Sequence, residues 1–268
     1  MANVVYENFY LSNEVEDQFD SHLDLMRFCT VDRTLEGTAG MKRLINVYSA
    51  SDATEKLGEN EGNTKSIEVG YTQREYNIEL AQNRFVWTDE AAMKDPMLVP
   101  VGMRHAGTDM FNTVNADVFG EFEKASLSVN ATAFNFDAFV DAVAKLNLPE
   151  NANVEVFGWV SPAAKAALRK ALKDDLKYIE AFSRHGYIGT VCNVHLFDKK
   201  DAKDNEICIG TKAAVTAFIK KGTEVEQITK NVRSAEDANV RKNTAFTRKY
   251  YVVALTDETQ AVKIVKTA

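Results

Sequence analysis

The feature that most constrains this fold is residues 38–95, where polar and apolar side chains alternate on both sides of a charged, glycine-bearing segment. The first run is MKRLINVYSA (41–50), the tip is DATEKLGENEGNTK (52–65), and the second run begins with SIEVGYTQ (66–73). Alternation with a period of two is typical of β-strands. The region is therefore predicted to form a long two-stranded β-ribbon with a solvated tip.

The alternation changes phase within the second run. Apolar side chains fall on odd positions as far as Tyr71 and on even positions from Tyr76 to Leu80. A slip of one residue moves every side chain of a strand to the opposite face, and a β-bulge supplies the one extra residue that is needed. We therefore expect a β-bulge or a strong twist near Gln73–Glu75.

A two-stranded ribbon is only marginally stable in water by itself. No other part of the sequence has a pattern that would cover it, so the ribbon is predicted to be a surface arm that packs on a neighbouring copy of the chain. Charged residues on its strands and at its tip are then candidates for contacts between subunits. These candidates are Arg43, Lys56, Glu59, Glu61, Lys65, Arg74 and Glu75.

Composition and charge argue against several classes of protein. The 268 residues carry a net charge of −7, whereas a general DNA-binding protein needs an excess of Lys and Arg to neutralise phosphates. The three cysteines are widely spaced and odd in number, which fits a reducing compartment and no disulfide framework. The first residues lack a signal-peptide pattern, and no apolar run reaches about 18 residues. We expect synthesis in a cytoplasm and no membrane association.

The segments on either side of the ribbon are predicted to be helical. Ser12 is a candidate N-cap for a helix that ends near Cys29–Asp32, and a second, long helix covers about 101–125 after the break at Asp95–Pro96. Three glycines weaken the long helix, and we interpret them as points of close packing or bending. They are Gly102, Gly107 and Gly120.

Residues 131–222 read as a mixed α/β segment. Asn135 and Ser161 are candidate N-caps of two short helices, the second with Pro at its first position. Strands are predicted in this segment and in the β-rich C-terminal part, over 154–160, 187–197, 206–221 as strand, turn and strand, 223–232, 247–256 and 261–266.

No motif of a known catalytic apparatus is present, whether for nucleotide binding, serine hydrolysis or zinc proteolysis. Cys192 and His195 are three residues apart, but on the strand predicted for 187–197 they point to opposite faces, and a metal site needs three or four ligands. Trp87 and Trp159 are interpreted as packing residues. The sequence predicts no enzyme, no cofactor and no metal.

The order of elements resembles the major capsid protein of tailed bacteriophages, the Hong Kong 97-type fold. That order is an N-terminal arm, a long ribbon, a long helix, a compact α/β insert and a β-rich end. Five stretches resemble the family in the same order along the chain. They are NRFVWTDEAAMKDP (83–96), VEVFGWVSPAAKAALRKAL (154–172), HGYIGTVCNVHLFD (185–198), ICIGTKAAVTAFIKKGTEVEQITK (207–230) and RKYYVVALTDETQAVKI (248–264).

The resemblance implies an α+β fold with named parts. Residues 1–37 would be the N-terminal arm with its short helix, and 38–84 the extended β-ribbon, or E-loop. Residues 85–130 and 223–268 would form the peripheral (P) domain around the long spine helix. Residues 131–222 would form the axial (A) domain.

The resemblance also implies a function. The chain would assemble into hexamers and pentamers of an icosahedral phage head in the host bacterial cytoplasm, and would end in the virion. A separate scaffolding protein and a portal protein are expected as partners, with packaged double-stranded DNA bound only weakly and non-specifically.

Three alternatives stay open at this point. The same fold builds encapsulin-type compartments, an α/β enzyme could use residues 131–222, and a phage tail or adaptor protein is a further class. Some relatives of the capsid family also crosslink a ribbon lysine to an asparagine, for which Lys56 and Lys65 are the candidates in this chain.

Overall fold

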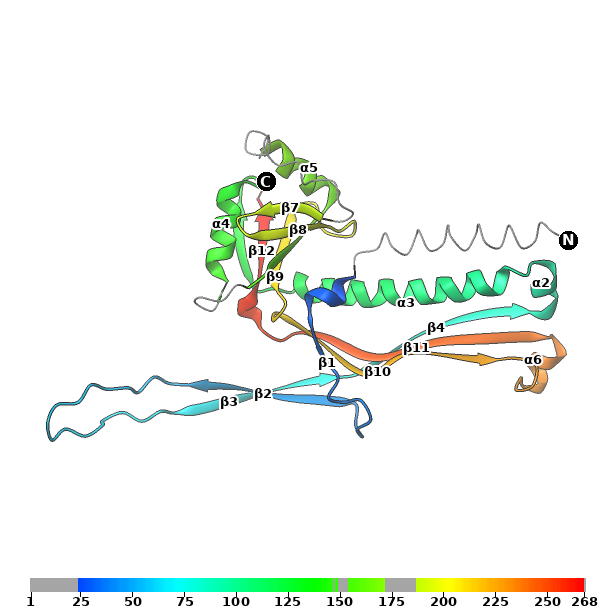
Figure 1. Cartoon of the computed structure of the whole chain (residues 1–268), viewed down its shortest axis with the longest axis horizontal. Helices are drawn as coiled ribbons and strands as arrows, with labels where there is room; N and C mark the ends of the chain where they lie inside the picture. Colours follow the sequence, from blue (N-terminus) through cyan, green and yellow to red (C-terminus); the bar gives the residue numbers. More distant parts are fainter. Residues whose placement is uncertain (1–23, 147, 149–153, 172–186, 268) are drawn as a thin grey trace.

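The computed structural model describes residues 24–146, 148, 154–171 and 187–267, and these form a mixed α+β fold with three β-sheets (Figure 1). A two-stranded sheet pairs β2 (Lys42–Ala50) with β3 (Val69–Asn77). The four-stranded sheet has the order β1 (Thr30–Asp32), β10 (Val215–Ile228), β11 (Lys242–Leu255) and β4 (Glu79–Thr88). The six-stranded sheet has the order β5 (Leu127–Ala131), β12 (Ala261–Lys266), β9 (Glu206–Thr211), β6 (Val156–Val160), β8 (Val194–Asp198) and β7 (Tyr187–Val191).

Helices cover and connect these sheets. The long helix α3 runs along the four-stranded sheet, and α4 and α5 lie beside the six-stranded sheet (Figure 1). The helices are η1 (Leu25–Phe28), α2 (Asp89–Lys94), α3 (Leu98–Glu123), α4 (Phe136–Lys145), α5 (Pro162–Ala171), α6 (Ala235–Asn239) and η3 (Glu258–Gln260). In the described part of the chain, no helix is long and apolar enough to cross a membrane.

The predicted ribbon is present, but the predicted bulge near Gln73–Glu75 is wrong. β2 and β3 pair without a register shift from Lys42 opposite Asn77 to Ala50 opposite Val69. The apolar side chains of β3 lie on both faces of the ribbon, with Tyr71 opposite Tyr48 and Tyr76 opposite Arg43, so the change of phase needs no extra residue. After Asn77 the chain leaves the ribbon and continues as β4 in the four-stranded sheet. Ile78 is buried, and its N–H donates to the Met41 carbonyl at 2.7 Å. Ile78 therefore marks the switch between the two sheets, and the phase change before it reflects apolar side chains on both faces of the ribbon.

The predicted long helix is confirmed as α3, and one of its three glycines is explained by close packing. A Cβ atom on Gly102 would lie 2.2 Å from the Phe85 ring, so only glycine lets β4 approach the helix there. Gly107 and Gly120 have open space where a Cβ would stand. Close packing is thus confirmed at Gly102 and does not account for the other two.

The predicted caps of the α/β segment are confirmed. The Asn135 side chain accepts from the Ala138 N–H at 3.1 Å, and the buried Ser161 hydroxyl accepts from the Ala164 N–H at 3.1 Å. These bonds satisfy N–H groups in the first turns of α4 and α5 that have no partner within the helix. Both helices begin where the sequence indicates.

The single strand predicted for 187–197 is wrong, because this segment is a hairpin of β7 and β8. Cys192 and Asn193 form its two-residue turn with φ of 50° and 64°, the positive values that a tight hairpin turn requires and that Asn adopts readily. Cys192 therefore lies in a turn and not on the strand that carries His195. Within the described ranges, no group of three His, Cys, Asp or Glu side chains is placed to hold a metal ion.

The C-terminal strands are longer and more continuous than predicted. The sequence predicts one strand that ends at residue 221 and another that begins at residue 223, whereas β10 is continuous through this point. The connection over 234–243 contains the short helix α6. The last predicted strand is confirmed as β12, which joins the six-stranded sheet between β5 and β9. The domain boundaries at 130/131 and 222/223 stay a prediction. β12, which lies in the segment predicted as peripheral domain, belongs to the same sheet as the strands of residues 131–222.

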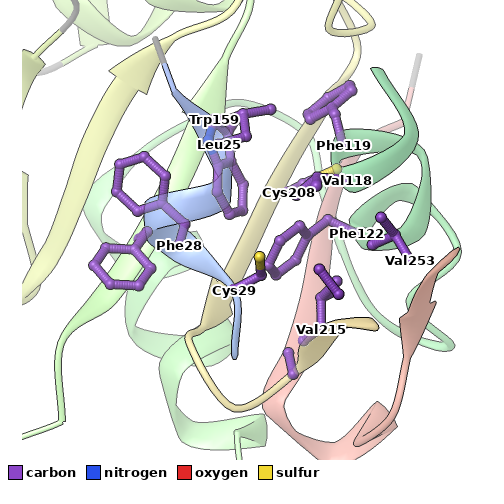
Figure 2. Close-up of a cluster of buried hydrophobic side chains, with 14 of the residues drawn as sticks. Leu25, Phe28, Cys29, Val118, Phe119, Phe122, Trp159, Cys208, Val215 and Val253 are labelled. Carbon is purple, nitrogen blue, oxygen red and sulfur yellow. The ribbon is translucent and has the colours of Figure 1, made fainter. Parts of the chain in front are cut away.

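The main hydrophobic core lies where the six-stranded sheet meets α3, and we call it the hub (Figure 2). Trp159 from β6 is fully buried there against the ring of Phe122 from α3, with ring centroids 4.4 Å apart. Leu25 and Phe28 from η1 enter the same core. The helix predicted to start at Ser12 lies outside the described residues except for this final part, which is a 3-10 helix followed by β1.

Candidate assembly surfaces

The ribbon projects away from the body of the molecule (Figure 1). The side chains on its two faces differ in burial. The face carrying Arg43 and Ile45 on β2, and Arg74 and Tyr76 on β3, is partly buried near the base of the ribbon. We call this the inner face. Every residue on the opposite, outer face is exposed. The ribbon is thus attached to its own chain at the base and uncovered elsewhere.

Two arginines of the inner face bind the body of the same chain. Arg43 Nη2 lies 3.3 Å from Asp32 Oδ2, while Arg74 donates to the Thr256 carbonyl at 3.2 Å and lies 3.7 Å from Glu258. Burial raises the pKa of Asp32, but hydrogen bonds from Thr34 and the Arg43 charge outweigh it and hold that pKa below its usual value. These contacts fix the base of the ribbon.

An aromatic contact and a lysine complete the attachment. Tyr76 stacks on Phe218 of β10 with ring centroids 5.1 Å apart. Lys220 donates to the carbonyls of Thr38 and Gly40, at 2.7 and 2.6 Å, and so holds the loop that enters β2. Gly40 has a φ of +102°, which favours glycine at this entry. The loop and both strands are therefore tied to one end of the four-stranded sheet.

The outer face carries apolar side chains that nothing in the described chain covers. Tyr48 and Tyr71 lie opposite each other with ring centroids 6.0 Å apart, and each is 66% exposed. Leu44 and Val69 are exposed on the same face, by 51% and 64%. Exposed apolar side chains gathered on one element mark interaction sites in soluble proteins. The outer face is a candidate contact surface.

The tip of the ribbon, residues 51–68, is acidic and structured by its own hydrogen bonds. Glu55 accepts from the Thr64 hydroxyl at 2.6 Å and from its N–H at 2.8 Å, and these bonds lower the pKa of Glu55. Glu61 accepts from the Gly58 N–H at 2.9 Å. Five carboxylates and two lysines stand in this segment, so the tip carries negative charge into solvent.

The seven predicted contact residues fall into two groups. Arg43, Arg74 and Glu75 make ion pairs within the chain, the last with Lys42 at 2.5 Å. The other four are exposed at the tip, and they are Lys56, Glu59, Glu61 and Lys65. Their role between subunits stays a prediction.

Sequence reasoning missed the apolar outer face. Its signal was present, because Leu44 and Tyr48 alternate with Ile45 and Val47, so both faces of β2 carry apolar side chains. A strand that is apolar on both faces is typically buried on both. The inner face is partly covered by the same chain, which leaves the outer face in need of a partner.

Comparison with known proteins identifies the fold. No family model and no curated protein sequence matches the chain. Solved structures do match. The mature capsid of bacteriophage PhiM1 matches with a TM-score of 0.69 and 10% sequence identity, over 91% of this chain and 87% of that one. The capsid of cyanophage P-SCSP1u matches with a TM-score of 0.68 and 11% sequence identity, over 89% of this chain and 86% of that one. A virus-like particle from Pyrococcus furiosus matches at 0.59 and 12%, covering 93% and 95%.

These matches extend over nearly the full length of both chains, so they concern the whole architecture and not one motif. At identities of 10 to 12% they define the fold alone. The chain has the Hong Kong 97-type capsid fold, as the order of its elements predicts.

Proposed function

We propose that this protein is the structural subunit of an icosahedral phage head and assembles into hexamers and pentamers that enclose double-stranded DNA. The observation that carries the proposal is the ribbon, which is fixed at its base and exposes an apolar outer face around Tyr48 and Tyr71. A monomer gains nothing from exposing such a face, whereas a subunit in a shell buries it against a neighbour.

The shared fold supports this proposal through the nature of the matched structures. Several are capsids of phages, among them those of PhiM1 and P-SCSP1u. The chain would then be a virion component assembled in the host cytoplasm, with a scaffolding protein and a portal protein as partners. Its net charge of −7 suits a container that does not bind its packaged polyanion tightly.

The alternatives are less favoured. An encapsulin-type compartment shell would share the same fold and is the second candidate, since the matched structures of PhiM1 and P-SCSP1u are phage capsids. For an enzyme, the sequence contains no motif of a known catalytic apparatus, and the described residues include no group of three His, Cys, Asp or Glu side chains placed to hold a metal ion.

The test is sedimentation of a lysate in which the full chain is expressed, alone and with candidate scaffolding proteins. Electron microscopy of the fast-sedimenting fraction should show closed icosahedral particles or flat capsomers built from the chain. Particles that enclose a protein cargo in place of DNA, in the native host, would shift the assignment to a compartment shell. Turnover of a substrate that a single change within 131–222 abolishes would favour the enzyme.

A further inference from the structure

The four-stranded sheet ends in a long open edge. β4 lies at that edge and pairs with β11 in an unbroken register from Glu79 opposite Tyr251 to Thr88 opposite Lys242. Within the described ranges, no strand pairs with the other side of β4. An edge strand presents a row of unpaired backbone N–H and C=O groups, which is a template for another strand.

The opposite edge of the same sheet is protected, and the contrast shows what β4 lacks. β1 covers β10 only at 216–218, and the register of β10 then shifts between Ile219 and Lys221 and again between Lys221 and Glu224. Bulges, lysines and short covering strands are the devices by which proteins block edge pairing. β4 has no bulge, no Pro and no Gly over its ten residues.

The side chains of β4 are also sorted by face. Odd-numbered residues turn toward α3, where Phe85 packs over Gly102 and Asn83 donates to the Ala106 carbonyl at 2.7 Å. The even-numbered residues from Leu80 to Val86 are exposed, and two of them are apolar, Leu80 at 47% and Val86 at 39%. The edge therefore carries an apolar side chain near each end on its solvent face.

We propose that β4 pairs in antiparallel register with β4 of a second copy of this chain, about a two-fold axis that passes beside Asn83. This register sets Leu80 of each copy opposite Val86 of the other, on both sides of the axis. Arg84 then faces the uncharged Gln82. A register centred on Arg84 or on Glu79 would instead set like charges opposite each other, which destabilises a strand pair.

The pairing agrees with the rules of symmetric association. Residues opposite each other in an antiparallel pair point to the same face, so the two copies would keep their α3 helices on one side of a continuous sheet. A two-fold contact uses the same patch on both copies, which requires a patch that complements itself. The Leu80 and Val86 pattern of β4 fulfils this requirement.

The inference deepens the proposed function and rests on it. A single pair of strands is a weak contact, and a shell holds copies of the chain close enough together for it to form, because their effective concentration is high. It names a second contact, distinct from the ribbon, and gives its partner as β4 of another copy.

The test is disulfide trapping in the full chain. The variant carries Leu80→Cys and Val86→Cys in a Cys192→Ser background, since Cys29 and Cys208 are buried. Six residues of strand span roughly 20 Å, which is too far for a disulfide within one chain. Mild oxidation should yield a reducible dimer at least about tenfold more abundant than in either single-cysteine variant, because only the pair meets across the axis.

A matched control carries Val225→Cys and Val240→Cys, which are similarly exposed but lie off the β4 edge. A second variant, Leu80→Ser with Val86→Ser, should fold with an unchanged melting temperature and assemble less. Oxidised dimer no more abundant than in the control overturns the inference.

The two proposals fail in different ways. Particles without the trapped dimer leave the shell function in place and remove the β4 contact. A trapped dimer without particles under any condition supports the β4 contact and removes the shell function.

Discussion

The hub and the ribbon both contain aromatic side chains, and they use them in opposite ways. In the hub, Trp159 is fully buried between α3 and the six-stranded sheet, beside Phe122. On the ribbon, Tyr48 and Tyr71 are each 66% exposed, and their rings lie 6.0 Å apart. The hub therefore stabilises the isolated chain. The ribbon contributes its apolar area only when a neighbour covers it.

The buried thiols show how closely the hub excludes water. Cys208 lies in the hub, and burial is the main cause that raises its pKa to about 12. Burial likewise raises the pKa of Cys29, brought to the hub by η1, to about 11. The contrast between hub and ribbon predicts that mutations in the two regions separate stability from assembly.

The largest expected effect on stability is that of Trp159→Ala. Removing a fully buried indole should lower the free energy of unfolding by about 3–5 kcal/mol, because it deletes apolar contacts and leaves a cavity. Urea unfolding of the monomeric protein measures this value. A change below about 1 kcal/mol would show that the hub is not the stabilising core.

A smaller loss of unfolding free energy is expected from a change where α3 meets the four-stranded sheet. Gly102→Ala places a Cβ against the Phe85 ring and should cost about 1–3 kcal/mol through overpacking. Gly107→Ala, in the same helix, meets open space and should stabilise by about 0.5–1 kcal/mol through helix propensity. Thermal unfolding of both variants is the measurement. Equal effects at the two positions would contradict the proposed packing of β4 on α3.

Removing a contact at the base of the ribbon should lower the free energy of unfolding by about 0.5–1 kcal/mol. Arg74→Ala removes a hydrogen bond to the Thr256 carbonyl and a partly exposed ion pair, which together contribute little in water. Arg74→Lys keeps the charge and should recover part of the loss. An unchanged monomer with impaired assembly would instead assign Arg74 to a contact between subunits.

A weaker, pH-dependent effect is expected at Asp32. Its pKa is lowered in the folded chain, so its stabilisation is present above the ordinary value of 3.8 and is lost as pH falls through the lowered one. The wild-type chain should lose more stability than Asp32→Asn over this acidic range. Unfolding midpoints at several pH values compare the two. Parallel curves would mean that neither the hydrogen bonds from Thr34 nor the charge of Arg43 stabilises the Asp32 carboxylate in the folded chain.

Local chemistry made much of this fold predictable. The helix α3 follows from apolar spacing, the starts of α4 and α5 follow from their caps Asn135 and Ser161, and the ribbon follows from alternation. Each of these signals acts within a few residues along the chain, so it can be read without the tertiary structure.

The features that were predicted wrongly or missed depend on contacts with residues far away in the sequence. Ile78 is an ordinary strand residue by sequence, whereas in the structure it is buried at the point where the chain passes from the ribbon to the four-stranded sheet. The hairpin at Cys192–Asn193 lacks the glycine that usually marks such a turn. The open edge of β4 is invisible in sequence, because which strand lies at an edge depends on the order of the whole sheet.

The smallest effect on stability and the largest on assembly are expected from Tyr48→Ser with Tyr71→Ser. Both side chains are exposed, so the free energy of unfolding of the monomer should change by no more than about 0.5 kcal/mol. Assembly should fall sharply because the outer face loses its apolar contacts. Deleting residues 52–64 provides a second variant that removes the tip and keeps both strands.

Light scattering after size-exclusion chromatography, applied to the wild-type chain and to the variant with Tyr48→Ser and Tyr71→Ser, shows directly whether the outer face of the ribbon drives assembly. We predict hexamers, pentamers or shells for the wild type, with or without a scaffolding protein, and a folded monomer of 29.9 kDa for the variant. A wild-type chain that stays monomeric at every concentration and with every co-expressed scaffold would contradict this prediction, as would a variant that assembles as well as the wild type.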